Sequence, residues 1–186
     1  MSQPEIDLLQ SVLDDTEAVI ASVAPGQERL PTPCTDFDVA RVVDHLVGWA
    51  SHFALSLNGG EVTGDPNDFR AGATPAIEFH QAGQAILAAY REGGEESQKM
   101  PIGILIMEFL VHGWDLATAT GSPVRFSPAA ADLALATGRQ MLAPEYRGPG
   151  KSFGEEVAVS DAAGPVDRLV AFLGRDPGWQ GAPGLS

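Results

Sequence analysis

The stretch "MEFLVHGWDLATATG", residues 107–121, carries the strongest structural signal in this sequence. It belongs to a segment over about 102–119 that is apolar around most of its circumference, which predicts the most buried helix of a helical protein. Glu108 and His112 lie on this helix four residues apart, so their side chains can reach one point in space. Because burying an unpaired carboxylate costs several kcal/mol, either this edge of the helix faces water or the pair holds a ligand.

The rest of the chain has the apolar spacing and the boundary residues of further helices. These helices are predicted over 5–23, 38–57, roughly 75–92, 127–142 and 165–173. Asp36 or Thr35 is the expected N-cap of the second helix, because short polar side chains accept hydrogen bonds from free backbone N–H groups. The stretch 93–101 is expected to be a polar connection.

Strand signals are weak in this sequence. Residues 59–73 predict a long polar loop, and residues 143–160 an irregular region with a short extended piece at "EEVAVS". No stretch alternates polar and apolar residues convincingly over six or more positions, as a half-buried strand would. The sequence therefore predicts an all-α fold, with a four-helix bundle over 1–125 and C-terminal helices and a tail over 126–186 packed on it.

The charge balance limits the classes of partner. The formal net charge of −14 repels phosphate backbones and anionic lipids, so neither a nucleic acid nor a membrane is expected as a partner. The N-terminal stretch lacks the features of a secretory signal, and no apolar run reaches the ~18–20 residues that span a bilayer. Cys34 is the only cysteine, so no intrachain disulfide forms, which fits a cytoplasmic location.

Two polar ridges on different helices point to chemistry. On a helical wheel, each ridge lies at a similar offset from the apolar stripe of its own helix. The ridges consist of Glu108, His112 and Asp115 on one helix, and of Asp38, His45, Trp49 and His52 on the other. If the ridges face each other, two imidazoles and a carboxylate meet, which is the ligand set of a catalytic zinc site with an open position. Nickel, iron and manganese accept the same donors.

A plainer interpretation of these residues stays open. A glutamate four residues before a histidine is common by chance, and a lone histidine beside an apolar stripe is more often a hydrogen-bonded boundary residue. His52 and His80 are interpreted as surface or boundary residues, with His52 as the reserve ligand. Asp115 is expected to be a charge on the helix surface, and orientation of His112 by Asp115 is the lesser alternative.

Three stretches of the sequence resemble a known family. "TPCTDFDVARVVDHLVGW" (32–49) resembles the segment that opens the second helix in the DinB-like, mycothiol-dependent maleylpyruvate isomerase superfamily of actinobacteria. "EFLVHGWDLATATG" (108–121) is similar to the fourth-helix motif of that group, and "DAAGPVDRLVAFLGRDPGW" (161–179) resembles the closing helix and tail of a short subgroup. The resemblance implies an up-down-down-up bundle, in which residues 58–74 cross over between parallel helices.

The resemblance also implies a ligand set and an activity. In that superfamily a metal, usually zinc, is held by residues that correspond to His45, Glu108 and His112. The implied function is that of a thiol transferase or cis–trans isomerase, in which the metal activates mycothiol or another small thiol for attack on an electrophile. Because the isomerases carry a larger C-terminal domain, the resemblance implies the metal site more directly than the isomerase reaction.

Two other functions remain as alternatives. The first is a metal-binding bundle without catalysis, for sensing, storage or protein contact, in which His52 or Asp115 closes the coordination sphere. The second is a plain bundle whose polar ridges are solvated. Cys34 is not expected to be a nucleophile, because it lies in a loop with no evident activating partner. The pocket walls are expected to come from the helices at 5–23 and 75–92 and from loops.

Overall fold

The computed structural model describes residues 2–148, 151 and 153–181. In this part of the chain the regular elements are all helical, which confirms the all-α prediction. The α-helices are α1 (Gln3–Ser22), α2 (Val39–Leu57), α3 (Pro75–Glu92), α4 (Glu95–Lys99), α5 (Ile102–Thr120), α6 (Pro128–Met141) and α7 (Pro165–Phe172). Two 3₁₀ turns, η1 (Pro66–Asp68) and η2 (Pro144–Tyr146), interrupt the connections.

Two local predictions differ from the structure. The polar connection before α5 contains the short helix α4, whereas the stretch 155–160 is irregular, as predicted. Asp38, rather than Thr35 or Asp36, caps α2, because its carboxylate accepts a hydrogen bond from the backbone N–H of Arg41. Residues 34–37 form a turn in which Phe37 N–H donates to the Cys34 carbonyl, so the helix begins only after this turn.

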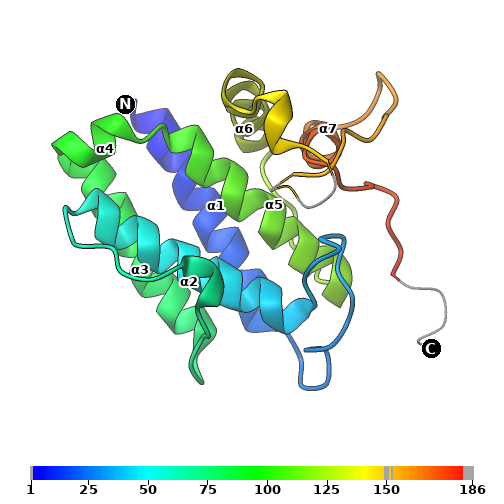
Figure 1. Cartoon of the computed structure of the whole chain (residues 1–186), viewed down its shortest axis with the longest axis horizontal. Coiled ribbons are helices and arrows are strands. Elements are labelled where there is room, and N and C mark those ends of the chain that lie inside the picture. Colours follow the sequence, from blue (N-terminus) through cyan, green and yellow to red (C-terminus); the bar gives the residue numbers. More distant parts are fainter. Residues whose placement is uncertain (1, 149–150, 152, 182–186) are drawn as a thin grey trace.

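Helices α1, α2, α3 and α5 form the body of the molecule, a four-helix bundle (Figure 1). In Figure 1, α1 and α5 run in one direction, and α2 and α3 run in the opposite direction. The order is therefore up, down, down, up. Because α2 and α3 are parallel, the chain has to return along the bundle between them, and residues 58–74 make this crossover. The crossover carries η1, which packs on α2.

The core centres on α5, whose side chains are buried around most of the helix. Phe109 lies at its middle and meets Phe53 of α2 and Phe79 of α3 edge to face. By length and mean hydropathy alone, α5 is long and apolar enough to cross a membrane, contrary to the sequence-based expectation. Most of it is buried inside the bundle, however, so its apolar character is explained by its place in the core.

The C-terminal part covers one side of α5. Helix α6 packs on α5, and α7 packs on α6. Two glycines permit these close approaches, because a Cβ at Gly103 would lie 2.8 Å from the Cβ of Thr137, and one at Gly138 would lie 2.9 Å from the ring of Phe172. Apolar side chains of α6 and α7 join the core of the bundle. The division of the chain at residue 125 stays a prediction.

Candidate metal centre

The structure brings His45 of α2 together with Glu108 and His112 of α5. The Nε2 atom of His45 lies 2.7 Å from Oε1 of Glu108, and the same oxygen lies 3.8 Å from Nε2 of His112. One donor atom from each of the three side chains lies within 4.8 Å of the other two. The polar ridges of α2 and α5 therefore face each other across the seam between the two helices.

The donor set fits a divalent cation of the zinc type. Donors at the usual bond length of ~2.0–2.1 Å around a tetrahedral zinc lie ~3.3 Å apart. The observed separations of 2.7 and 3.8 Å lie on either side of that value, so small side-chain shifts suffice to surround an ion. Two imidazoles and one carboxylate also leave a coordination position free for a small molecule.

Each imidazole has a polar partner behind it, on the side away from Glu108. The Nδ1 atom of His45 lies 3.2 Å from Oδ1 of Asn67 on η1. The Nδ1 atom of His112 lies 3.1 Å from Oδ2 of Asp115, close enough for an ion pair although the atoms are not aligned for a hydrogen bond. In both rings Nε2 is thus the nitrogen that faces the centre. This arrangement is typical of metal-binding histidines.

The prediction that Asp115 is a surface charge is wrong. Its side chain is fully buried, and both carboxylate oxygens meet the guanidinium of Arg175, at 3.2 Å from Nη2 and 3.4 Å from Nε. Arg175 follows α7, 60 residues along the chain, and is itself buried. The ion pair with Arg175 compensates the cost of burying the Asp115 carboxylate. A helical wheel of α5 alone cannot reveal this pair, because Arg175 lies outside that helix.

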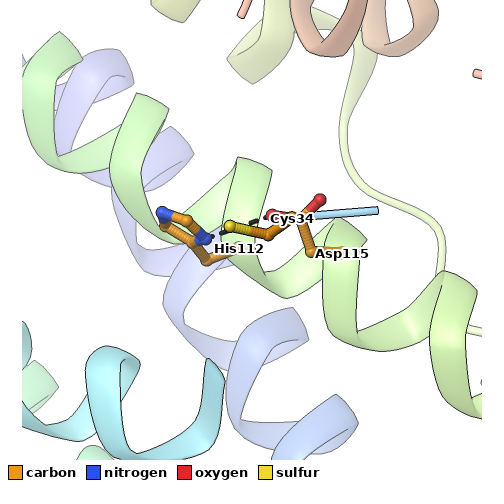
Figure 2. Close-up of side chains that lie close together, drawn as sticks. All are labelled: Cys34, His112 and Asp115. Atoms are coloured by element: carbon orange, nitrogen blue, oxygen red, sulfur yellow. Dashed lines mark ion pairs between the residues drawn. The ribbon is translucent and has the colours of Figure 1, made fainter. Parts of the chain in front are cut away.

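A second group of possible donors consists of Cys34, His112 and Asp115 (Figure 2). Figure 2 shows the sulfur of Cys34 beside the imidazole of His112, whose other neighbour is the Asp115 carboxylate. We do not assign an ion to this group, because the positive charge of Arg175 already occupies both oxygens of Asp115. Burial also raises the pKa of the Cys34 thiol to about 11, so it stays protonated and a poor nucleophile at neutral pH.

The electrostatic environment of the first group favours the ionised form of Glu108 and the neutral form of His112, and these are the forms that bind cations. Burial by itself raises the pKa of Glu108, but the charge of His112 and the hydrogen bond from His45 outweigh it and lower the pKa to about 2. Burial lowers the pKa of His112, against the opposing effect of Glu108 and Asp115. At neutral pH the site therefore offers a carboxylate and an imidazole with a free lone pair.

A cavity of about 590 Å³ opens beside the three donors. Its walls come from α2, α5, the turn at 33–37, η1 and the C-terminal part of the chain. The apolar and aromatic residues that line it include Phe37, Trp49, Phe53, Met107, Leu142 and Phe153. None of the described lining residues belongs to α1 or α3, so that part of the predicted source of the walls is wrong, whereas the predicted contribution of loops is confirmed by residues 33–37. The C-terminal part covers the α2–α5 seam, whereas α1 and α3 lie elsewhere in the bundle.

The remaining histidines lie outside this centre. His52 packs against Trp49 in a tilted arrangement, with ring centroids 5.1 Å apart, and belongs to neither group of donors. His80 is exposed on α3 and pairs with Glu17 of α1 at 2.7 Å. Sequence reasoning missed Asn67 and Arg175, because both lie in segments without helical periodicity. The only local signal for Asn67 is the preceding Asp65-Pro66 pair, which starts η1.

Comparisons with known proteins identify the family of this chain. The sequence model of the mycothiol maleylpyruvate isomerase N-terminal domain matches residues 9–117, a range that includes α2 and α5. Uncharacterised proteins from two strains of Mycobacterium tuberculosis are each 32% identical over 178 residues, covering 89% of this chain and 94% of the relative. No solved structure gives a significant match. The chain belongs to the family of the mycothiol maleylpyruvate isomerase N-terminal domain.

Proposed function

We propose that this protein holds a divalent cation through His45, Glu108 and His112 and uses it in a thiol-dependent transfer or isomerisation. Zinc is the favoured ion, with nickel, iron or manganese as alternatives for the same nitrogen and oxygen donors. One observation carries the proposal: three donor side chains from two helices converge at the wall of a cavity large enough for a small molecule.

The thiol part of the proposal rests on the family and on general chemistry. When bound, a divalent cation of this kind stabilises the thiolate form of a small thiol such as mycothiol at neutral pH. The sulfur of Cys34 is unsuited to this role, since burial keeps it protonated. The reacting sulfur is therefore that of a second small molecule. His45, Glu108 and His112 hold the centre, and Asp115 supports His112 from behind.

The electrophile is an activated alkene or an epoxide. The thiolate sulfur forms a bond to one alkene carbon, while the π electrons move to the activating group. Rotation about the former C=C bond, now single, and expulsion of the thiolate, which restores the double bond, give the other isomer, whereas protonation of the adduct gives a thioether. Opening of an epoxide forms a C–S bond, breaks a C–O bond and leaves a hydroxyl after protonation. Apolar rings such as Phe37 and Phe153 favour an apolar electrophile and limit the access of water.

A non-catalytic metal protein would need a fourth protein donor. Asp115 is engaged with Arg175 on the far side of the His112 ring, and His52 lies outside the donor group. This favours an open coordination position and hence chemistry. We further propose that the protein acts in the cytoplasm on small molecules, without a nucleic acid or membrane partner.

Metal analysis tests the proposal first. Untagged protein is expected to carry one divalent ion per chain or to gain one on incubation, and His112→Ala is expected to lose it. His80→Ala is the matched control, because it removes an exposed histidine far from the centre. A wild-type protein that neither carries nor gains a stoichiometric ion overturns the proposal.

A thiol-transfer assay then separates catalysis from storage. The metal-loaded protein is mixed with a generic aryl electrophile and, in turn, with mycothiol, glutathione and cysteine. Metal-dependent consumption of one of these thiols, absent in His112→Ala, supports the transferase proposal. Stoichiometric metal without consumption of any of the three thiols supports the non-catalytic alternative.

A further inference from the structure

The crossover between α2 and α3 brings a side chain to the back of His45. Asn67 lies on η1, and its Oδ1 atom is 3.2 Å from Nδ1 of His45. No motif and no helical periodicity marks this position in the sequence, yet it is the polar contact of the His45 ring on the side away from Glu108. What Asn67 does depends on which end of its amide faces the ring.

Two neighbours determine the orientation of that amide. Nδ2 of Asn67 donates to Oδ1 of Asp65 at 3.0 Å, and a carboxylate can only accept. The indole N–H of Trp49 donates to Oδ1 of Asn67 at 3.4 Å, and an indole can only donate. Both contacts would be lost if the amide were turned around. The oxygen of Asn67 therefore faces His45.

The Asn67 oxygen determines which nitrogen of the His45 ring can bind a metal. An amide oxygen is an acceptor, so Nδ1 of His45 carries the hydrogen in this contact. Nε2 is then the nitrogen that points to Glu108 and to the cavity. In the structure Nε2 donates to the Glu108 carboxylate, and a metal that binds there takes the place of this proton. The hydrogen bond also fixes the rotation of the His45 ring about its bond to Cβ. This rotation sets the direction in which Nε2 points.

A glycine on α2 makes room for the contact between Asn67 and His45. Where η1 crosses α2, the helix has Gly48, and a Cβ at that position would lie 2.6 Å from the carbonyl oxygen of Pro66 and 2.7 Å from the Cβ of Phe69. Both distances are too short for atoms that are not bonded, so any side chain there pushes the crossover away from α2. Gly48 thus lets the backbone beside Asn67 approach the helix that carries His45.

We propose that Asn67, oriented by Asp65 and Trp49, is a positioning residue that presents Nε2 of His45 to the metal. This inference rests on the proposed metal site. Partners of metal-binding histidines commonly contribute ~10–100-fold to metal affinity. The same range is expected here, because the contact fixes both the nitrogen and the direction of its lone pair.

Zinc affinity, measured by competition with a chromophoric chelator, tests the proposal. Asn67→Ala is expected to weaken zinc binding by ~10–100-fold. The double exchange Asp65→Asn with Asn67→Asp keeps the net charge, the donor–acceptor pair between the two positions and an oxygen facing His45, and is expected to restore most of the affinity. Asn58→Ala, which removes another asparagine from the same crossover, is expected to bind zinc as the wild type does.

Nuclear magnetic resonance adds a second measurement, the signal of the Nδ1 proton of His45, which reports on this hydrogen bond rather than on the packing of the crossover. In the zinc-loaded wild type, the Nδ1 proton of His45 is expected as a slowly exchanging, downfield signal. In Asn67→Ala, this signal is expected to move or to vanish through exchange with water, while the Nδ1 proton of His112 stays unchanged.

The outcomes separate this inference from the function on which it rests. Failure of the wild type to bind zinc removes both. Zinc binding by the wild type together with an affinity of Asn67→Ala within about threefold of it overturns the role of Asn67 alone. An equal loss in the double exchange, or in Asn58→Ala, also overturns it, since the loss would then come from packing of the crossover.

Discussion

Arg175 and Asp115 form a two-point ion pair inside the protein, with distances of 3.2 and 3.4 Å between guanidinium nitrogens and carboxylate oxygens. Asp115 is fully buried and only 9% of the Arg175 side chain is exposed. The pair joins the segment after α7 to α5 directly behind His112. It therefore connects the stability of the C-terminal part to the geometry of the candidate metal centre.

The first prediction concerns this ion pair. Arg175→Ala leaves an uncompensated carboxylate in the core, so the free energy of unfolding is expected to fall by ~3–5 kcal/mol. Arg168→Ala, which removes an exposed ion pair with Asp132, is the control and is expected to cost ~0–1 kcal/mol. Urea unfolding of the metal-free proteins measures both changes. Similar losses in the two variants would contradict the structural role of the buried pair.

The second prediction concerns thermal stability and metal. An ion that binds only the folded state stabilises it by ~4 kcal/mol when its free concentration is ~1,000 times the dissociation constant. Zinc added to chelator-treated protein is therefore expected to raise Tm, and His45→Ala is expected to abolish the shift. His80→Ala keeps all three donors, so its shift should match the wild type. The melting temperature is followed by circular dichroism, and an unchanged wild-type value on zinc addition would refute metal binding to the folded state.

The third prediction concerns acid. The folded-state pKa of His112 lies below its ordinary value of 6.5, so its contribution to stability is present above pH 6.5 and is lost as the pH falls through the folded value. Glu108 has an ordinary pKa of 4.5, lowered to about 2, so its contribution is lost between those values. Metal-free protein is therefore expected to lose stability in both ranges.

Urea unfolding at a series of pH values measures this dependence. His112→Gln removes the group that titrates in the upper range, and the stability of this variant is expected to change less between pH 7 and 5 than that of the wild type. A steeper loss in the variant than in the wild type over that range would contradict the assignment.

The fourth prediction concerns the approach of the crossover to α2. Gly48→Ala is expected to destabilise the protein by ~1–3 kcal/mol through overpacking against Pro66 and Phe69. It should also weaken zinc binding, because it moves η1 away from His45. Gly83→Ala, within α3, is the matched control, since its Cβ would lie at an ordinary contact distance of 3.6 Å from the side chain of Leu13 on α1. Calorimetric zinc titration of both variants checks the prediction, and undiminished binding by Gly48→Ala would contradict it.

The helices and part of the centre could be predicted because their signals are local. The apolar circumference of α5 follows from about five turns of sequence, and the spacing of Glu108 and His112 places them together on any α-helix. To assign His45 to the site, one has to know which faces of the two helices meet. The two matching polar ridges and the family resemblance supplied this information. The bounds of α2 were predicted correctly, but its N-cap was not, since Thr35 and Asp36 lie in the turn at 34–37 that precedes the helix.

The outer partners of the histidines could not be predicted in this way. Asp115 is polar and lies at the edge of an apolar stripe, a pattern typical of a surface residue, and its partner Arg175 lies 60 positions later in a glycine- and proline-rich segment. Asn67 lies in a loop that Asp65 and Pro66 shape locally, but its approach to His45 depends on the contact of the loop with α2 at Gly48. In both cases the burial and pairing depend on tertiary contacts.

The cavity walls are divided between two parts of the chain, and this division has an evolutionary consequence. The donors stand on the bundle, whereas Met141, Leu142, Phe153 and Leu173 close the cavity from the C-terminal side. Changes in that later segment therefore reshape the cavity and leave His45, Glu108 and His112 in place. If the proposed function holds, the bundle supplies the reactive centre, and the segment from Met141 to Leu173 is where the choice of substrate can diverge between relatives.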